Sequence, residues 1–500
     1  MGKILTRTIS KLNQGIQPNL YEDGFARIEH FDVVSGQARP HKGVSLSTTI
    51  GLSGASTATL AFLKFESIAG TIYGVGVDNS TPTQGAIYSW DATNEWGTKQ
   101  SFGLASVPNA LFFQHKGTFY GLRNSRYIYS IVPGGAYDDE ITGGDLTSVS
   151  SFADGFVHSK DGVAYFATDN KIHKLLATDS SYALALTLPN TNFVITSICE
   201  AGNFVNIVGY DSNTNISSSL LWDRDTSVTD LTQSYLLGAE VVYHNATLGG
   251  RTFFVQLRQD QDDTAFSEQP VLVIKYLNGD NPEIVLELPV NSFSITSGLI
   301  GGKYIANDRL YFAARVRLLG ESTATNRCFV LDKNGKLSIA TNLGVDTGTN
   351  LIRGVYVQGQ GFWFAGGSDG SWSNGSSGNT SYTTTSIIET TKIRSDDLSK
   401  NVSFKGAIVT CEPLPSGGQV VVAARKNSSE LNVTPSASWM TLKTFTTDDD
   451  VKLGLPALVA NNALSMRNVK EFQLRVESTG GAVITGFQYA YEEVDAENYG

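Results

Sequence analysis

Gly-Thr-Ile-Tyr-Gly-Val at residues 70–75 and Gly-Thr-Phe-Tyr-Gly-Leu at residues 117–122 are two copies of one phrase that decides the fold. In each copy a turn residue precedes an aromatic-rich run of strand-forming residues. Five looser copies begin at residues 161, 201, 250, 307 and 359, so successive copies stand about 40 to 57 residues apart, the spacing of β-propeller blades. Because one four-stranded blade cannot bury both of its faces, neighbouring blades must cover one another in a ring. The phrase therefore predicts an all-β propeller of about seven blades, with six or eight as alternatives.

Changes in composition along the chain predict five segments. Residues 1–50 are expected to form an extended arm, residues 51–375 the propeller, and residues 376–384 a linker of low complexity. Residues 385–493 carry about eight strand-like runs without the phrase, which is typical of a jelly-roll-like β-sandwich, and residues 494–500 form an acidic tail. Within the propeller, the strand-like runs that follow the phrase, such as residues 86–90 and 127–131, are expected to be the outer strands of their blades.

The N-terminal arm has too little apolar surface to fold alone, so it must lie on its own propeller or on another chain. One interpretation makes it a strand that closes the propeller ring, followed by a loop. The other makes it an intermolecular arm with Ile16, Pro18, Phe25 and Phe31 as apolar anchors. The two interpretations carry equal weight, and both can hold together. Under the second, deletion of residues 1–45 is expected to leave a folded monomer that cannot enter an assembly.

Composition argues against several classes of protein. The 500 residues carry a formal net charge of −11, which disfavours a general nucleic-acid-binding surface. No apolar run approaches the length of a membrane span and no signal peptide is found, so a soluble protein made in a cytoplasm is expected. The three cysteines, Cys199, Cys328 and Cys411, have no metal-ligand spacing and are expected to be buried free thiols.

No residue pattern predicts a catalytic, cofactor-binding or metal-binding residue. Asp-Ser-Asn-Thr-Asn at residues 211–215 resembles the start of a calcium loop but lacks its central Gly and distal Glu, so a polar hairpin tip is favoured. Three consecutive aspartates at residues 448–450 are interpreted as a solvated turn. The six histidines stand beside no Ser or Cys in a nucleophile motif, and most are expected at the surface near turns.

Glycoside chemistry is the enzymatic alternative, because β-propellers host sialidases and related hydrolases. Ser-Asp-Gly-Ser-Trp at residues 368–372 faintly resembles their Asp-box hairpin, but it occurs once and fits an ordinary Asp-Gly turn better. Trp90, Trp96 and Trp372 are the candidate glycan contacts under this alternative, although packing in the blade core is the favoured role of most tryptophans here.

Residues 9–18, Ile-Ser-Lys-Leu-Asn-Gln-Gly-Ile-Gln-Pro, resemble the N-terminal arm of tail nozzle proteins of short-tailed bacteriophages. In that family a run S-x-x-L-x-x-G-I-x-x-x-P is followed about twenty residues later by Arg-Pro, which Arg39 and Pro40 match; the first proline of this chain is displaced by two positions. Residues 412–417 and 484–493 are similar to the sandwich domains that end propeller-bearing phage structural proteins. The resemblance covers the arm specifically and the propeller only as architecture.

The resemblance implies a virion structural protein that forms a hexameric ring around the phage tail axis, beneath the portal and adaptor proteins, with fibres as further partners. DNA would pass the ring without tight binding, which suits an acidic body because phosphate neutralisation dominates non-specific affinity. The inter-subunit contacts would come from the arm, at Ile9, Leu12, Gly15, Ile16, Gln17, Pro18, Phe25, Phe31, Arg39 and Pro40. The expected function is non-enzymatic and uses no cofactor; the alternative is a glycan- or receptor-binding, or sialidase-like, propeller of a phage particle.

Overall fold

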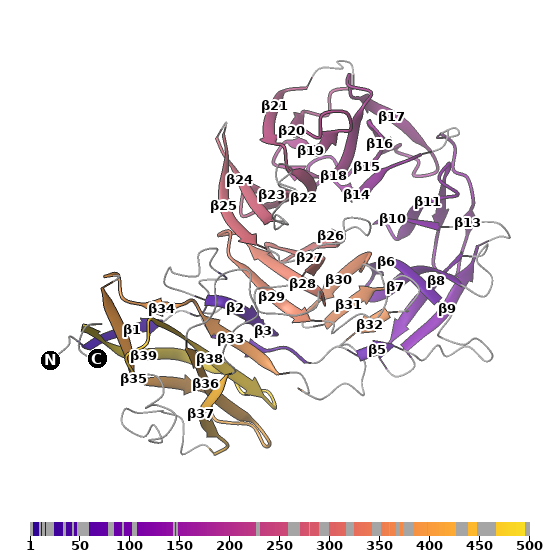
Figure 1. Cartoon of the computed structure of the whole chain (residues 1–500). Helices are drawn as coiled ribbons and strands as arrows, with labels where there is room; N and C mark the ends of the chain where they lie inside the picture. The colour runs from indigo at the N-terminus through magenta and orange to yellow at the C-terminus, as the bar shows by residue number, and fades with distance from the viewer. Residues whose placement is uncertain are drawn as a thin grey trace.

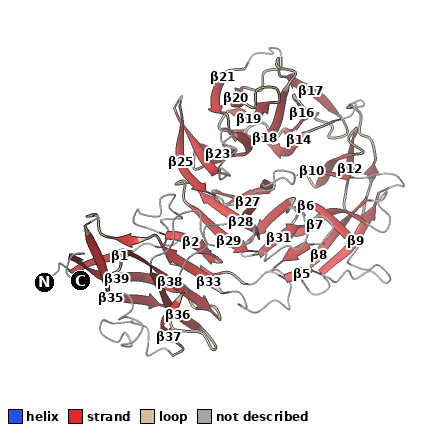
Figure 2. Cartoon of the chain, viewed as in Figure 1, coloured by secondary structure: helices blue, strands red, loops and turns tan. Residues whose placement is uncertain are grey.

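Every regular element in the described part of the computed structural model is a β-strand (Figure 2). Among these residues, none belongs to a helix that is long and apolar enough to cross a membrane. The structure describes residues 4–9, 12, 16, 25–33, 37–42, 45–47, 60–78, 85–92, 95–102, 108–143, 146, 149–226, 231–258, 271–279, 281–289, 300–316, 325–342, 352–359, 361–366, 371–373, 382, 385–397, 399–426, 439–447 and 467–495.

Seven sets of four antiparallel strands follow one another around a ring (Figure 1). The first strand of each set contacts the first strands of the two neighbouring sets, and the contact between β30 and β6 closes the ring. The first three sets are β6 (Leu60–Ile68), β7 (Thr71–Asp78), β8 (Gly85–Asp91) and β9 (Glu95–Ser101); β10 (Pro108–His115), β11 (Thr118–Arg123), β12 (Tyr127–Ile131) and β13 (Tyr137–Asp138); and β14 (Phe152–Val157), β15 (Ala164–Thr168), β16 (Lys171–Leu175) and β17 (Tyr182–Thr187). The fourth and fifth are β18 (Phe193–Ala201), β19 (Phe204–Asp211), β20 (Ser217–Trp222) and β21 (Gln233–Gly238); and β22 (Val241–Leu248), β23 (Arg251–Arg258), β24 (Val271–Asn278) and β25 (Asn281–Pro289). The sixth and seventh are β26 (Ile300–Ala306), β27 (Arg309–Val316), β28 (Thr325–Asp332) and β29 (Leu337–Asn342); and β30 (Gly354–Gln358), β31 (Gly361–Ala365), β32 (Ser371–Ser373) and β5 (Ser45–Ser47).

Each of the seven copies of the phrase forms the second strand of a set, from β7 to β31. A second strand has a neighbour on both sides and a packed set on both faces, so nearly all of its residues are buried, as in β15 and β31. This confirms that the phrase marks a repeated strand of a propeller-like, all-β fold. The expected outer strands were wrong, because the runs at residues 86–90 and 127–131 form third strands. The true outermost strands, such as β9, carry mixed polar sequence or, like β13, only two residues, and therefore gave no clear pattern.

Aromatic side chains fill the spaces between neighbouring sets. Between the first and second sets, Tyr73 of β7 meets Phe119 of β11 with ring centroids 5.2 Å apart, and Phe112 stacks on Phe119 at 4.9 Å. These residues belong to one buried cluster that draws on both sets. Aromatic pairs of this kind contribute about 0.5–1.5 kcal/mol beyond the area they bury. The aromatic residues of the phrase therefore hold the ring together between sets.

Gly302 on β26 allows the innermost strands of the sixth and seventh sets to approach closely. Its N–H donates to the Ile352 carbonyl at 3.1 Å, and a Cβ added there would lie 2.2 Å from the Arg353 carbonyl oxygen. Because this neighbour is backbone and cannot swing away, we expect Gly302→Ala to lower the free energy of unfolding by about 1–3 kcal/mol in urea titrations. Gly97→Ala is the matched control, since a Cβ there meets nothing within 4 Å. Equal stability of the two variants would contradict this close approach.

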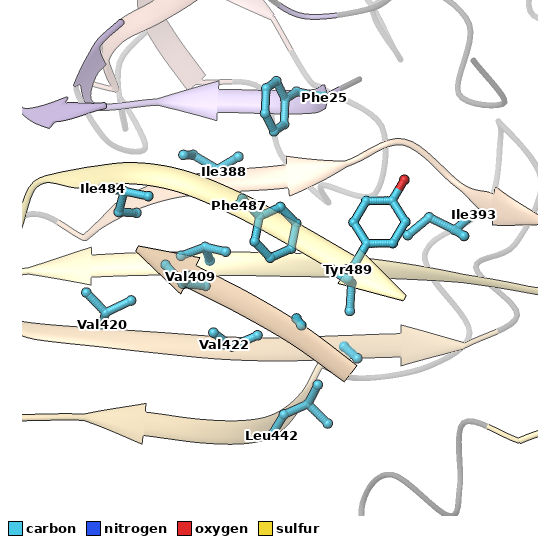
Figure 3. Close-up of a cluster of buried hydrophobic side chains, with 14 of the residues drawn as sticks. Phe25, Ile388, Ile393, Val409, Val420, Val422, Leu442, Ile484, Phe487 and Tyr489 are labelled. Atoms are coloured by element: carbon cyan, nitrogen blue, oxygen red, sulfur yellow. The ribbon is translucent and has the colours of Figure 1, made fainter. Parts of the chain in front are cut away.

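A second body follows the ring and consists of two sheets that share one core. One sheet contains β1 (Ile4–Ile9), β39 (Ile484–Asp495) and β35 (Lys400–Cys411) in that order. The other contains β33 (Ser386–Thr390), β38 (Glu471–Thr479), β36 (Gln419–Lys426) and β37 (Met440–Phe445), with β34 (Ile393–Arg394) beside β38. Figure 3 shows the buried apolar side chains of this core, among them Val422, Ile484 and Phe487. The strand β39 extends to Asp495, within the segment expected to be an acidic tail.

The N-terminal segment is built into both bodies. Its strand β1 pairs with β39, and Leu12 is buried in the core of the second body, whereas Ile16 is buried between the fifth and sixth sets of the ring. Strand β2 (Phe25–Glu29) then pairs with β29 of the ring on one side and with β33 of the second body on the other. A single ten-stranded sheet results, in the order β26-β27-β28-β29-β2-β33-β38-β36-β37 with β34 beside it.

The remainder of the segment reaches the seventh set. A short hairpin of β3 (Phe31–Asp32) and β4 (Arg39–Pro40) leads on, and β5 pairs with β32 as the fourth strand of that set. This arrangement agrees with the first interpretation of the arm, a strand of the same chain that closes the ring. The predicted arm is therefore distributed over both bodies of its own chain.

Candidate functional site

A cavity of about 440 Å³ opens at one end of the ring axis, between the first strands of five sets. We call it the channel-end cavity. Its wall combines charged and hydroxyl side chains with apolar ones, so it suits a small polar molecule that also has an apolar part. The residues that line it are Lys64, Glu66, Gly155, Phe156, Ile198, Cys199, Glu200, Gly202, Thr247, Lys303, Tyr304 and Ile305.

Lys303 is held rigidly in the cavity wall. Its ammonium donates to the Ser197 hydroxyl and to the Asn245 carbonyl at 3.1 Å, with the Asn245 side-chain oxygen and the Ile198 carbonyl each 3.4 Å away. These partners come from the fourth and fifth sets, whereas Lys303 belongs to the sixth. One side chain therefore connects three neighbouring sets at the axis.

Buried polar side chains extend this contact away from the axis. The Ser197 hydroxyl donates to the Asn245 side-chain oxygen at 2.6 Å, and the Asn245 amide donates to the Asn206 side-chain oxygen at 2.7 Å. The Asn206 amide in turn donates to the Ser219 hydroxyl at 2.7 Å. All four residues are buried, and their hydrogen bonds satisfy groups that would otherwise cost free energy. The chain of contacts thus fixes the position of the Lys303 charge.

The two acidic residues of the cavity have different partners. The Glu200 carboxylate accepts from the Ser159 backbone N–H at 2.9 Å and from the Ser159 hydroxyl, which joins the fourth set to the third. The Glu66 carboxylate lies 4.0 Å from the Lys64 ammonium on the same strand. The side chain of Lys64 is buried and that of Glu66 is partly exposed. The cavity therefore holds charges of both signs.

Burial favours the neutral forms of three other titratable side chains in or beside the cavity, Cys199, His244 and Tyr304. Burial raises the pKa of the Cys199 thiol. The nearby Lys303 charge acts in the opposite direction but does not cancel this effect. Burial and then the Lys303 charge lower the pKa of His244 to about 3, and its Nε2 lies 2.8 Å from the Gly301 carbonyl oxygen. Burial raises the pKa of the Tyr304 hydroxyl well above its usual value. A protonated thiol is a weaker nucleophile than a thiolate.

A second cavity, of about 290 Å³, lies where the β3–β4 hairpin covers the sixth and seventh sets. The Arg309 guanidinium lies 3.3 Å from the Asp32 carboxylate and 3.4 Å from the Tyr311 hydroxyl in its wall. Burial lowers the pKa of His41 to about 4, against the opposing charge of Asp32, and its ring meets Phe362 edge to face at 4.9 Å. These contacts attach the N-terminal hairpin to the ring, so this cavity belongs to the junction between that hairpin and the sixth and seventh sets.

Several of the residues predicted to make inter-subunit contacts are buried within this chain. Leu12, Ile16, Phe25 and Phe31 are buried in its own cores, and the Ile9 backbone pairs with Phe487. Pro40 pairs with Phe31, and Arg39 is well exposed, with its guanidinium 2.6 Å from the Glu412 carboxylate. Gly15, Gln17 and Pro18 lie outside the described residues. The apolar members thus have partners within one copy, and their inter-subunit role stays a prediction.

The tryptophans suggested as glycan contacts are packed where they are described. Trp96 is buried against Phe65, with stacked rings 5.3 Å apart, and Trp90 packs 4.9 Å from Trp96 and 6.1 Å from Trp363. The backbone of Trp372 lies in β32, but its side chain is outside the described part, as are residues 368–370 of the Asp-box-like run. The described tryptophans therefore do not favour the glycan-binding alternative.

The expectation that most histidines lie at the surface was wrong. His30, His41, His115, His158, His173 and His244 are all buried. They stand near turns and strand ends in the sequence, but the packing of neighbouring sets and of the N-terminal segment covers these positions. Two of the three cysteines, Cys199 and Cys328, are buried, Cys411 is partly buried, and all three are free thiols.

Lys64 and Lys303 were missed at the sequence level. Each is a lysine within an apolar or glycine-rich run that precedes a copy of the phrase, and a charge at such a buried position is the signal that would have singled them out. Within the described residues, no three His, Cys, Asp or Glu side chains come together to hold a metal ion. The Asp211 run is a polar turn, as expected, in which the carboxylate accepts from the Asn213 and Thr214 N–H groups. Residues 448–450 lie outside the described part.

No family model and no curated protein match this chain. Among solved structures, the computationally designed Ika8 protein is similar over 66% of this chain and 99% of its own, with a TM-score of 0.39 and 10% identity. BamB from Moraxella catarrhalis is similar over 66% and 97%, with a TM-score of 0.38 and 12% identity. An exo-β-1,3-galactanase from Phanerochaete chrysosporium is similar over 90% and 100%, with a TM-score of 0.31 and 12% identity. Similarities this distant assign no function.

Proposed function

We propose that this chain is a seven-bladed β-propeller with a C-terminal β-sandwich that serves as a non-enzymatic structural subunit of a short-tailed phage particle. In this proposal several copies form a hexameric ring around the tail axis, next to adaptor or portal-proximal proteins and fibres. The protein is made in the host cytoplasm and incorporated into the virion.

The ten-stranded sheet that joins the two bodies is the observation that carries the proposal. Strand β2 pairs with both bodies, and the neighbouring residues Leu12 and Ile16 are buried in different cores. Two bodies connected by one hydrogen-bonded sheet cannot swing on a flexible linker, because any rotation would break ladder hydrogen bonds. A stiff subunit of this kind suits a ring that must keep its shape while DNA passes. The net charge of −11 agrees with passage without tight binding.

The outermost strands offer a surface for contact between copies. Leu184 on β17, Leu236 on β21 and Ile284 on β25 are 53%, 71% and 53% exposed and stand on three consecutive sets. An edge strand carries unpaired backbone N–H and C=O groups that can pair with another chain, and exposed aliphatic side chains add apolar surface that association would bury. Both features favour contact between chains. In the proposed ring, a second copy of this chain covers this surface.

Native mass spectrometry and negative-stain electron microscopy of the purified full chain test the proposal. We expect closed rings whose formation rises with protein concentration, and we expect Leu236→Glu to weaken ring formation while leaving the fold intact. The dissociation constant for duplex DNA at physiological salt is expected to be no tighter than the ~10⁻⁴–10⁻⁶ M of non-specific binding. A protein that stays monomeric at every concentration, alone and with its neighbouring tail proteins, would rule the proposal out.

A further inference from the structure

We propose that the channel-end cavity binds a small zwitterion, a molecule that carries a carboxylate and an ammonium group a few ångströms apart on a short aliphatic chain. The inference rests on the order in which the cavity arranges its charges along the ring axis. It does not depend on ring formation or on a role in a phage particle.

Basic residues form the inner layer of the cavity. The first strands β6, β18 and β26 each end in a tight turn that leads into the second strand of the same set. Lys303 stands three positions before Ala306, the last paired residue of β26, and Lys64 stands four positions before Ile68, the last of β6. The Lys303 charge is fixed by its contacts with Ser197 and Asn245, and it reaches His244 and Cys199, where it opposes protonation. An anionic group is therefore favoured at this depth.

Acidic residues form the outer layer. Glu200 stands one position before Ala201, the last paired residue of β18, and Glu66 stands two positions before Ile68. With a rise of about 3.3 Å per residue, the backbone positions of the outer and inner residues are centred about 7 Å apart along the strands. The side chains of Lys64 and Glu66 lean together, to 4.0 Å between charged atoms. A cationic group is favoured at the outer layer, beside the two carboxylates.

The two layers together discriminate between kinds of ligand. A simple anion is attracted by Lys64 and Lys303 but repelled by Glu66 and Glu200, and a simple cation experiences the reverse. A molecule with a single charge is therefore attracted by one layer and repelled by the other. A zwitterion with its carboxylate inward is favoured at both. The apolar side chains of Phe156, Ile198 and Ile305 also line the cavity and suit a short methylene chain between the charges. This combination defines an ω-amino acid such as 4-aminobutanoate.

Isothermal titration calorimetry with the unmodified full chain tests the proposal first. The probe is 4-aminobutanoate, and the matched ligands are butanoate, which lacks the ammonium, and butylamine, which lacks the carboxylate. We expect saturable binding of the probe and binding at least about tenfold weaker for each matched ligand, a loss of about 1.4 kcal/mol or more. No binding of the probe up to about 10 mM, or equal binding of all three molecules, would overturn the proposal.

Two variants place the binding in the cavity. Glu66→Gln removes a charge of the outer layer at a partly exposed side chain, and Lys64→Met removes one of the inner layer. Each is expected to weaken binding of 4-aminobutanoate about tenfold or more. Lys116→Met, on an exposed side chain that pairs with Asp179 elsewhere, is the control and should bind like the unmodified protein. If both cavity variants bind as tightly as the control, the ligand lies elsewhere and the proposal fails; if one misfolds, the ligand panel and the other variant still decide.

Discussion

Replacing Phe25 with alanine is expected to lower the free energy of unfolding by about 3–5 kcal/mol, the cost of removing a large buried aromatic side chain. Phe25 is fully buried in the core of the second body, on the strand that joins this body to the ring (Figure 3). The loss is a large part of the 5–15 kcal/mol by which domains are usually stable. Urea unfolding followed by tryptophan fluorescence measures it, since tryptophans lie in both bodies.

Leu236→Ala is the control for Phe25→Ala. Its side chain is 71% exposed, so the change is expected to stay within about 0.5 kcal/mol. Similar stability of the two variants would mean that the N-terminal segment does not contribute to the core of the folded chain.

The burial of the N-terminal segment changes what its deletion should do. Removal of residues 1–45 takes Leu12, Ile16, Phe25 and Phe31 out of two cores and removes β1 and β2 from their sheets. It also takes the first residue of the strand that completes the seventh set. A folded monomer after this deletion is therefore no longer expected. Loss of assembly by such a truncation would report unfolding, and single exposed substitutions such as Leu236→Glu are the sharper test.

Acidification is expected to destabilise the protein between about pH 6.5 and pH 4. Burial lowers the pKa of His30, His41 and His173 to about 4 and that of His244 to about 3. Below about pH 6.5 these histidines bind protons in the unfolded chain but stay neutral in the folded chain. Their contribution to the stability is therefore fully present above that pH and is lost as the pH falls towards the pKa values of the folded chain. The four histidines act in the same direction, so their effects on the stability add. Thermal unfolding at a series of pH values between neutrality and pH 4 measures the sum.

His173→Gln is expected to make the acid-induced loss smaller by about 2–3 kcal/mol. The His173 ring is buried against Phe166 and lies 2.8 Å from the Thr168 hydroxyl, a hydrogen bond that glutamine can also make. Burial also lowers the pKa of His115, but the Asp179 carboxylate 3.2 Å from its ring partly offsets this effect. His115→Gln is therefore the comparison variant and is expected to reduce the acid-induced loss by less than His173→Gln does. A melting temperature that stays constant down to pH 5 would contradict neutral, buried histidines.

The strands of the ring were well predicted because their signal is local. A strand buried on both faces must be apolar along its length, so each copy of the phrase marks a second strand whatever surrounds it. The outermost strands were missed because β9 has a mixed polar sequence and β13 has only two residues, so their sequences resemble loops. The same holds for the second body. Its long alternating runs, such as those of β36 and β38, were predicted as strands, whereas the pairing of β1 and β2 with this body was not predicted.

From the order of its residues alone, this protein could be assigned an all-β fold with a repeated, aromatic second strand, since burial of each such strand depends on its own side chains. The tertiary structure decided the rest. It brought β1 and β2 to partners more than 300 positions away and buried six histidines beneath neighbouring strands. It also set Lys303 opposite Ser197 and in one cavity with Lys64 and Glu66. These contacts arise because a closed ring places the first strands of all sets side by side, and no local pattern encodes which distant residues will then share one cavity.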